Sequence, residues 1–319
     1  MRTSTQSLLT AALLAALATA GCSQPAPAPV ASVPAPAADP APATPAPAAN
    51  ADVFRFKVGS LDAFALKDGD IDAPNDGKTF GVGQPAAAVA DVLKAAGEPS
   101  DVLHLSIQPL LVRAGERVLL FDTGAADASF AKAGRLPASL RAAGVEPSQV
   151  TDIFISHRHA DHVGGLVTKD GTLAFPNATV HLSAPEWAAL QGDADAKALV
   201  AAIAPKVDAF TPGAELVPGT VTAVVDDGHT PGHSAYEIAS GDERLLYIGD
   251  SAHHFIVSVQ RPEWTIAYDE NDALGKQRRR EILKRAAEAK ARVYAVHFPF
   301  PGIGRVEAKG EGFVWVPER

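Results

Sequence analysis

Beyond residue 50, short apolar and polar runs alternate along the chain in patterns that predict strands and helices. Alternation with a period of two on both sides of a turn is typical of hairpins, and it occurs over 53–58 with 63–67 and over 105–112 with 118–121. Further strands are predicted at 152–155, 179–182, 221–225, 236–239, 245–248 and 292–296. Helices are predicted at 136–143, 184–190, 194–204 and 272–289. Because strands outnumber helices, we expect packed sheets with helices outside.

The first fifty residues follow a different pattern. Arg2, an apolar run over 7–20 and small residues at its end predict a secretory signal over 1–22. Its end, Gly21-Cys22, resembles a bacterial lipobox, in which the cysteine is acylated; a cleaved signal with a chance cysteine is the alternative. Residues 23–50 are nearly all Ala and Pro, which predicts an extended linker before a domain over 51–319. We therefore expect an exported protein, either an outer-membrane lipoprotein anchored through Cys22 or a periplasmic one.

Composition narrows the class of protein. The 319 residues are 47% hydrophobic, and 28 basic against 37 acidic side chains give a net charge of −9. A negative chain disfavours nucleic acid as a partner. The basic run 276–280 is interpreted as the solvated face of a helix, with pairs Glu281/Arg285 and Lys284/Glu288 four residues apart. One cysteine excludes a disulfide framework.

The most informative segment follows the predicted strand 152–155. It contains His157, His159, Asp161 and His162, although the whole chain has only 10 histidines. Imidazole nitrogen and carboxylate oxygen are ligands that suit Zn²⁺. A turn after the strand lets the first two histidines point to one position and the last two residues to another. The segment therefore predicts the start of two metal sites.

The pattern His-x-His-x-Asp-His after a strand resembles the signature of the metallo-β-lactamase superfamily of hydrolases. The resemblance implies an α+β fold, specifically a four-layer αββα sandwich. It also implies further ligands in 228–233 (GHTPGH), Gly249-Asp250 and 295–297. Carried onto this chain, one zinc ion is held by His157, His159 and His233, the other by Asp161, His162 and His297, and Asp250 bridges them. His229 is interpreted as a turn residue or as an indirect support of the site.

A closer likeness is to methyl parathion hydrolases, with similar stretches in lactonases. It rests on the segments 122–126, 161–166, 173–178 and 298–304. The chain departs from those phosphotriesterases after Asp250, where it reads Ser-Ala-His-His-Phe over 251–255 instead of apolar residues. His253 or His254 is therefore a candidate donor to a substrate oxyanion, with capping or packing as the alternative. Candidate aromatic pocket walls are Phe130, Trp187, Phe255, Trp264 and Phe298.

Together these features predict an exported hydrolase with two Zn²⁺, or other divalent ions, acting on a small ester-like molecule. The resemblance implies attack by a hydroxide shared between the metals, and Asp161 is a candidate proton carrier as well as a ligand. Lactones and carboxyl esters are favoured over phosphotriesters. The alternatives are a β-lactamase, which Asp250 disfavours, and a non-catalytic zinc-binding lipoprotein, which the complete ligand set disfavours.

Overall fold

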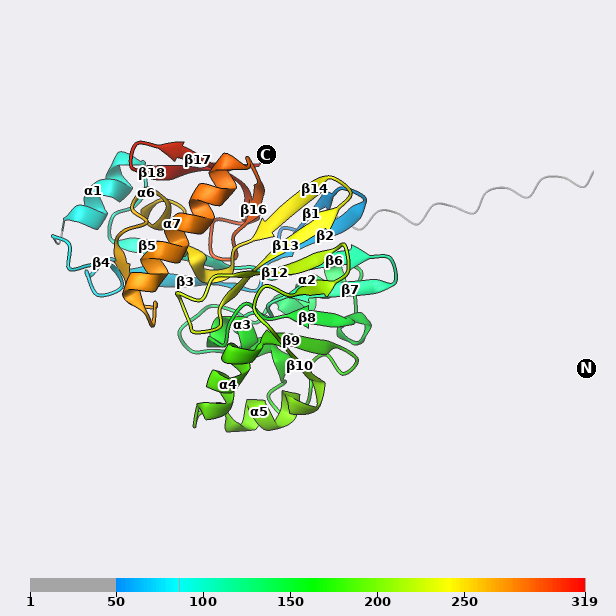
Figure 1. The fold of residues 1–319 in the computed structure, drawn as a ribbon. Helices are drawn as coiled ribbons and strands as arrows, with labels where there is room; N and C mark the ends of the chain where they lie inside the picture. Colours follow the sequence, from blue (N-terminus) through cyan, green and yellow to red (C-terminus); the bar gives the residue numbers. More distant parts are fainter. Residues whose placement is uncertain (1–49, 86, 319) are drawn as a thin grey trace, which may run out of the picture. The chain divides into compact units, whose positions relative to one another are not determined.

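Two seven-stranded β-sheets form the centre of the computed structural model, which describes residues 50–85 and 87–318 (Figure 1). Across the first sheet lie β1 (Val53–Val58), β2 (Leu61–Leu66), β6 (Leu110–Ala114), β7 (Arg117–Phe121), β8 (Asp152–Phe154), β9 (Thr179–Ser183) and β10 (Val207–Phe210). Across the second lie β11 (Glu215–Val217), β12 (Val221–Val225), β13 (Ser234–Ser240), β14 (Glu243–Tyr247), β16 (Arg292–Tyr294), β17 (Ile303–Lys309) and β18 (Gly312–Pro317). The predicted signal and the linker up to residue 49 lie outside the described residues.

Side chains alternate across both sheets and bury both faces of the central strands. In β7, Leu119 and Phe121 point into the core between the sheets, whereas Leu120 points to the outer face. In β14, Leu245 and Tyr247 lie in the same inner core and Leu246 lies outside. Strands buried on both faces require helices as outer covers.

Helices cover both outer faces. The helices α2 (Leu136–Ala142), α4 (Ala184–Gly192) and α5 (Lys197–Ile203) pack on the first sheet through Leu140, Leu190 and Ile203. The long helix α7 (Asp272–Glu288), orange in Figure 1, packs on the second sheet through Ile282 and Leu283. The expected four-layer αββα sandwich is therefore confirmed.

A smaller apolar cluster lies beside the sandwich. It joins the two-stranded sheet β3 (Gly69–Pro74) and β5 (Val102–Ile107), the pair β4 (Phe80–Val82) and β15 (Thr265–Ile266), α1 (Ala88–Ala95) and α6 (Val257–Gln260). Short 3₁₀ turns complete the fold at η1 (Pro147–Gln149), η2 (Gly164–Leu166), η3 (Ala204–Lys206) and η4 (Gly249–Ser251). None of the helices among the described residues has the length and apolar character needed to cross a membrane.

Most predicted elements are confirmed, but one strand is wrong. The structure divides the predicted strand 105–112 at Gln108-Pro109, so that β5 pairs with β3 and β6 joins the first sheet. Pro109 has no N–H to donate to a strand ladder, so the strand is interrupted there. The side chain of the preceding Gln108 donates to the carbonyls of Ala295 and Phe298, both at 2.9 Å. The hairpin β17–β18 and the helix α1 were not predicted.

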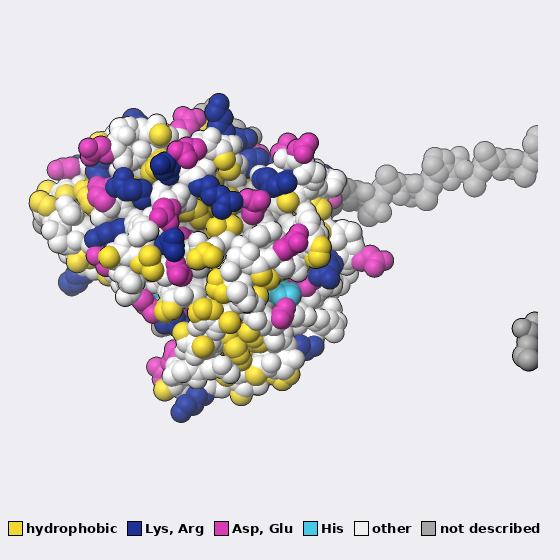
Figure 2. Space-filling view, viewed as in Figure 1, with side chains coloured by type: hydrophobic (Ala, Val, Ile, Leu, Met, Phe, Trp, Pro, Cys, Tyr) yellow, Lys and Arg dark blue, Asp and Glu magenta, His cyan; other side chains and the backbone are white. Residues whose placement is uncertain are grey.

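The basic run 276–280 lies on a helix, as predicted, but its interpretation as a wholly solvated face is wrong. Arg279 is fully buried, because it points between α7 and the loops beside it. On the exposed side Lys284 and Glu288 pair at 3.8 Å, whereas Glu281 pairs with Arg278 rather than Arg285. In Figure 2 the basic side chains over this region are interspersed with acidic ones.

The inner core generates a stability prediction. Leu119 is fully buried between the sheets, so Leu119→Ala removes apolar contacts and leaves a cavity, and we expect it to lower the free energy of unfolding by about 2–5 kcal/mol. Denaturant unfolding of the purified protein measures this loss. The control is Val316→Ala on the outermost strand, where the side chain is 39% exposed and we expect a change within about 0.5 kcal/mol. Equal losses in the two variants would contradict the inner-core assignment.

Candidate metal centre

Loops at the ends of strands from both sheets converge on one cluster of histidines and aspartates. The segment with His157 and His159 follows β8 and leads into α3 (Ala160–Val163). His229 lies between β12 and β13, Asp250 follows β14 and His297 follows β16. The sandwich therefore brings together residues that are up to 140 positions apart in the chain.

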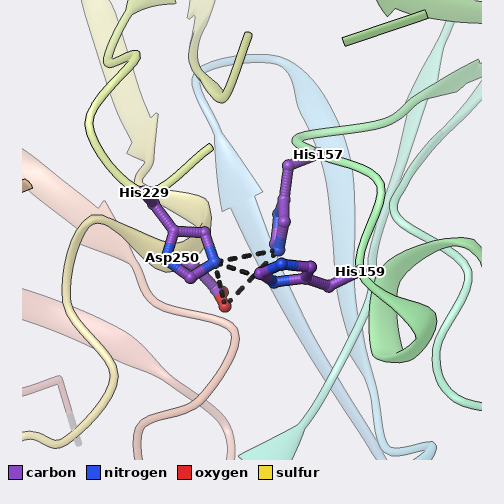
Figure 3. Close-up of side chains that lie close together, drawn as sticks. All are labelled: His157, His159, His229 and Asp250. Carbon is purple, nitrogen blue, oxygen red and sulfur yellow. Dashed lines mark hydrogen bonds and ion pairs between the residues drawn. The ribbon is translucent and has the colours of Figure 1, made fainter. Parts of the chain in front are cut away.

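The first group consists of His157, His159, His229 and Asp250 (Figure 3). Nε2 of His229 lies 3.2 Å from Nε2 of His157 and 3.0 Å from Nδ1 of His159. Oδ2 of Asp250 lies 3.5 Å from the same His229 nitrogen and 3.7 Å from Nε2 of His157. Four ligand atoms thus point at one another around a shared centre.

The second group consists of Asp161, His162 and His297. Oδ2 of Asp161 lies 3.6 Å from Nε2 of His162 and 3.4 Å from Nε2 of His297. Oδ1 of Asp250 lies 3.2 Å and 3.1 Å from the same two nitrogens. Each carboxylate oxygen of Asp250 therefore faces a different group.

The donor set fits two divalent cations. Nε2 of His162 and Oδ1 of Asp250 are buried and have no hydrogen-bond partner among the described residues. Burying a polar atom without a hydrogen-bond partner destabilises the folded state, and a metal ion that accepts the lone pair of this atom would remove the penalty. Imidazoles with shared carboxylates are the donors that Zn²⁺ and related ions prefer. Both groups are therefore candidate metal sites, bridged by Asp250.

The assignment of His233 as a ligand needs correction. The structure places His229, and not His233, beside His157 and His159. Both nitrogens of His233 already have partners: Nε2 accepts the backbone N–H of Asp250 at 2.9 Å and Nδ1 donates to the carbonyl of Asp226 at 3.0 Å. The turn over 230–232 separates the two histidines, and His233 leads directly into β13 behind Asp250. His233 therefore holds the backbone of Asp250 in place on the side away from the two groups.

Gly249 shows how closely this support packs. Its φ is +48°, and a Cβ on it would lie 2.5 Å from Nε2 of His233. A side chain there would both strain the backbone and push His233 away from the Asp250 N–H.

Asp122 supports the site, although no sequence pattern identified it as a candidate. This buried carboxylate accepts hydrogen bonds from the Ser156 backbone N–H, the Ser156 hydroxyl and Nδ1 of His162, each at 2.7 Å, and from the Tyr247 hydroxyl at 2.6 Å. The bond to Nδ1 leaves the Nε2 lone pair of His162 directed into the second group. Its sequence signal is an aspartate directly after β7, in the same Asp-Thr-Gly segment that carries the family likeness.

Burial and charge set the protonation of the ligands. Burial and neighbouring imidazoles lower the pKa of His157 well below its usual range, and burial does the same for His229. Both rings are therefore neutral, as metal ligation requires. Burial alone would lower the pKa of His162, but Asp250, Asp161 and Asp122 raise it well above the usual value. The carboxylates around this ring would attract a metal cation equally.

A cavity of about 460 Å³ opens beside both groups. Its lining includes the rings of His253 and Tyr268, which lie next to each other, together with Ile71, Leu105 and Phe130. Of the aromatic walls predicted from the sequence, Phe130 alone lines this cavity.

The structure also separates His253 from His254. His253 lines the cavity, with Nε2 3.2 Å from Oδ2 of Asp250, and neither ring nitrogen has a hydrogen-bond partner among the described residues. His254 points away from the cavity, and its Nδ1 accepts the backbone N–H groups of Ile256 and Val257 at 3.3 Å. Burial lowers the pKa of His254 to about 4, so it is a neutral acceptor at the start of α6.

The chain is similar to known proteins in sequence and in fold. A sequence model of the metallo-beta-lactamase superfamily matches residues 105–297. AidC, a dizinc quorum-quenching lactonase solved with a product, is 30% identical; the match covers 84% of this chain and 97% of that one, with a TM-score of 0.79. The hydrolase AbOPH of the beta lactamase superfamily is also 30% identical, over 85% and 99%, with a TM-score of 0.77. A probable metal-dependent hydrolase from Staphylococcus aureus shares the fold at 20% identity, over 82% and 99%, with a TM-score of 0.70. No curated protein matches the chain.

The two histidines of the 228–233 segment make the first group testable. We expect His229→Ala to lower the zinc content by about one ion per chain, because it removes a ligand, and His233→Ala to lower it less, because His233 holds the backbone of Asp250 without facing a metal group. Elemental analysis after dialysis against buffer measures the content. Loss of zinc from His233→Ala, with none from His229→Ala, would restore the original assignment.

Proposed function

The chain belongs to the metallo-beta-lactamase superfamily and is a metal-dependent hydrolase, and from this premise we propose that it hydrolyses small lactones or carboxyl esters with two zinc ions. One ion would be held by His157, His159 and His229 and the other by Asp161, His162 and His297, with Asp250 available to both. Zinc ions in such a pair, when bound, polarise the scissile carbonyl and acidify a water molecule.

The side chains of the site have separate tasks in this proposal. Asp250 stays ionised: burial would raise its pKa, but His162, His297 and His253 hold that pKa well below its usual value. Asp161 belongs to the second group and also lines the cavity, so it both ligates and faces the substrate. From that place its carboxylate is able to accept a proton during hydrolysis.

The observation that carries the preference for a carbonyl substrate is the position of His253. It lines the cavity next to Asp250 with both ring nitrogens free of hydrogen-bond partners among the described residues. A preorganised N–H donor stabilises the oxyanion that forms when a carbonyl is attacked. A histidine donates in either protonation state, which suits this task at neutral pH.

The cavity walls suit a substrate with an apolar part. Ile71, Leu105, Phe130 and Tyr268 all line the cavity together with His253. Support also comes from AidC, which is 30% identical and was solved with the product of a lactone. We therefore place lactones first, carboxyl esters second and phosphotriesters third.

Export and membrane attachment form a separate part of the proposal. It rests on the lipobox-like end of the signal and on Cys22 being the only cysteine of the chain. The Ala/Pro-rich stretch 23–50 would then serve as the spacer between the lipid anchor and the hydrolase domain.

The substrate assignment predicts the effect of removing one imidazole. We expect His253→Ala to lower kcat for a lactone by about 100- to 1,000-fold with a smaller effect on KM, because the lost donor acts mainly in the transition state. Steady-state kinetics on lactones, aryl esters, phosphotriesters and β-lactams measures both the loss and the substrate order. The matched control is His254→Ala, which removes an equally buried imidazole outside the cavity and should leave kcat unchanged.

Three results would contradict this assignment. An unchanged kcat in His253→Ala would reduce His253 to a packing residue. A wild-type preference for a phosphotriester or a β-lactam over every lactone and ester would move the enzyme to a different substrate class, and no turnover of any substrate by the zinc-loaded chain would favour the non-catalytic zinc-binding lipoprotein.

The anchor is tested by Cys22→Ala in the producing cell. We expect this variant to move from the membrane fraction to the soluble periplasmic or culture fraction, because the acylated side chain is gone. Immunoblotting of separated fractions follows the protein, and the His253→Ala variant serves as a control that keeps the anchor. A Cys22→Ala protein that stays with the membranes would contradict lipid anchoring.

A further inference from the structure

Arg279 is the largest fully buried side chain among the described residues, although it lies in the basic run of α7. Its guanidinium donates to the backbone carbonyls of Ser251 at 3.0 Å, Pro262 at 3.1 Å and Trp264 at 3.2 Å. It also forms an ion pair with Asp269, whose side chain is equally buried at 1% exposure. A buried arginine with this many partners fixes the segments that it touches.

Asp269 connects this arginine to the metal centre. Its Oδ1 lies 3.0 Å from Nδ1 of His229, and its other oxygen pairs with Arg279. Nε2 of His229 is then the nitrogen that faces His157 and His159. An acceptor on one ring nitrogen keeps the proton there and leaves the lone pair of the other nitrogen for a metal.

The backbone contacts around Asp269 leave no spare room. A Cβ on Gly275 of α7 would lie 2.7 Å from Oδ2 of Asp269, and a Cβ on Gly228, next to His229, would lie 2.6 Å from Cα of Gly275. The helix α7 therefore packs directly on the loop that carries His229, and two glycines permit the contact.

We propose that Asp269 and Arg279 are positioning residues that hold His229 in the tautomer and orientation needed at the first metal group. Arg279 extends the same control to the segment after Asp250 through the carbonyl of Ser251. Helix α7, which carries none of the metal ligands, thereby contributes to the geometry of the first metal group. This inference rests on the proposed metal function.

The test measures metal binding and not only activity. Zn²⁺ is titrated into the metal-free protein against a competing chelator, and the absorption spectrum of the Co²⁺-loaded protein is recorded. We expect Asp269→Asn to weaken one of two metal equivalents by about 10- to 100-fold and to change the Co²⁺ bands, because the charge that orients His229 is lost. The second equivalent should stay within about threefold of the wild type.

The matched control is Asp152→Asn. Asp152 also contacts a histidine at 3.0 Å in a buried pair, but its partner His181 belongs to neither metal group. This variant should lose stability and keep the metal affinity and Co²⁺ spectrum of the wild type. A purely structural role of Asp269 would make the two variants alike.

Gly275→Ala is a second probe that keeps every polar group. Its added methyl group collides with Asp269, so we expect the same selective loss of one metal equivalent even though alanine favours helix more than glycine. It also serves if Asp269→Asn does not fold. Wild-type metal affinity in the folded Asp269→Asn or Gly275→Ala variant would overturn this inference alone, whereas a wild-type chain that binds no metal at either group would overturn the proposed function with it.

Discussion

The candidate metal centre is organised around one buried carboxylate, Asp250, which faces imidazoles on two sides. Each oxygen of Asp250 points at a different group of histidines, and the side chain is almost fully removed from water. An ionised carboxylate in such a place is unfavourable unless positive charge compensates it. Two cations would satisfy both oxygens and the lone pairs of the facing imidazoles at once, whereas protonated histidines would compensate the charge in the second group only and leave the neutral imidazoles of the first group facing one another.

The rest of the fold holds the other ligands at the right distance from this carboxylate. The ring of His162 is fixed by Asp122, that of His229 by Asp269, and that of His297 by the carbonyl of Ser106 at 2.7 Å. Each of these partners contacts the ring nitrogen that points away from the site. Asp122 follows β7, Asp269 precedes α7 and Ser106 lies in β5. The ligand geometry therefore depends on the assembly of both sheets with the small apolar cluster beside them.

Short apolar strands predicted packed sheets with helices outside, whereas the four-layer sandwich and the two ligand groups were implied by the family resemblance that the dense motif 156–162 carries. The resemblance assigned His233 rather than His229 as the ligand. Both lie in one Gly-His-Thr-Pro-Gly-His segment, and only the turn between them decides which ring faces His157 and His159 and which contacts the backbone of Asp250. The burial of Arg279 and its pairing with Asp269 were also not predictable. Helical periodicity places Arg279 on a face of α7, but only the tertiary packing shows that this face covers the site.

Anomalous X-ray diffraction at the zinc edge, from crystals of the zinc-loaded protein, determines whether Asp250 joins two metal ions. We expect two anomalous peaks about 3.5–4 Å apart, one among His157, His159 and His229 and one among Asp161, His162 and His297, with Asp250 between them. A single peak at full zinc loading, or a pair of peaks that Asp250 does not contact, would contradict this expectation.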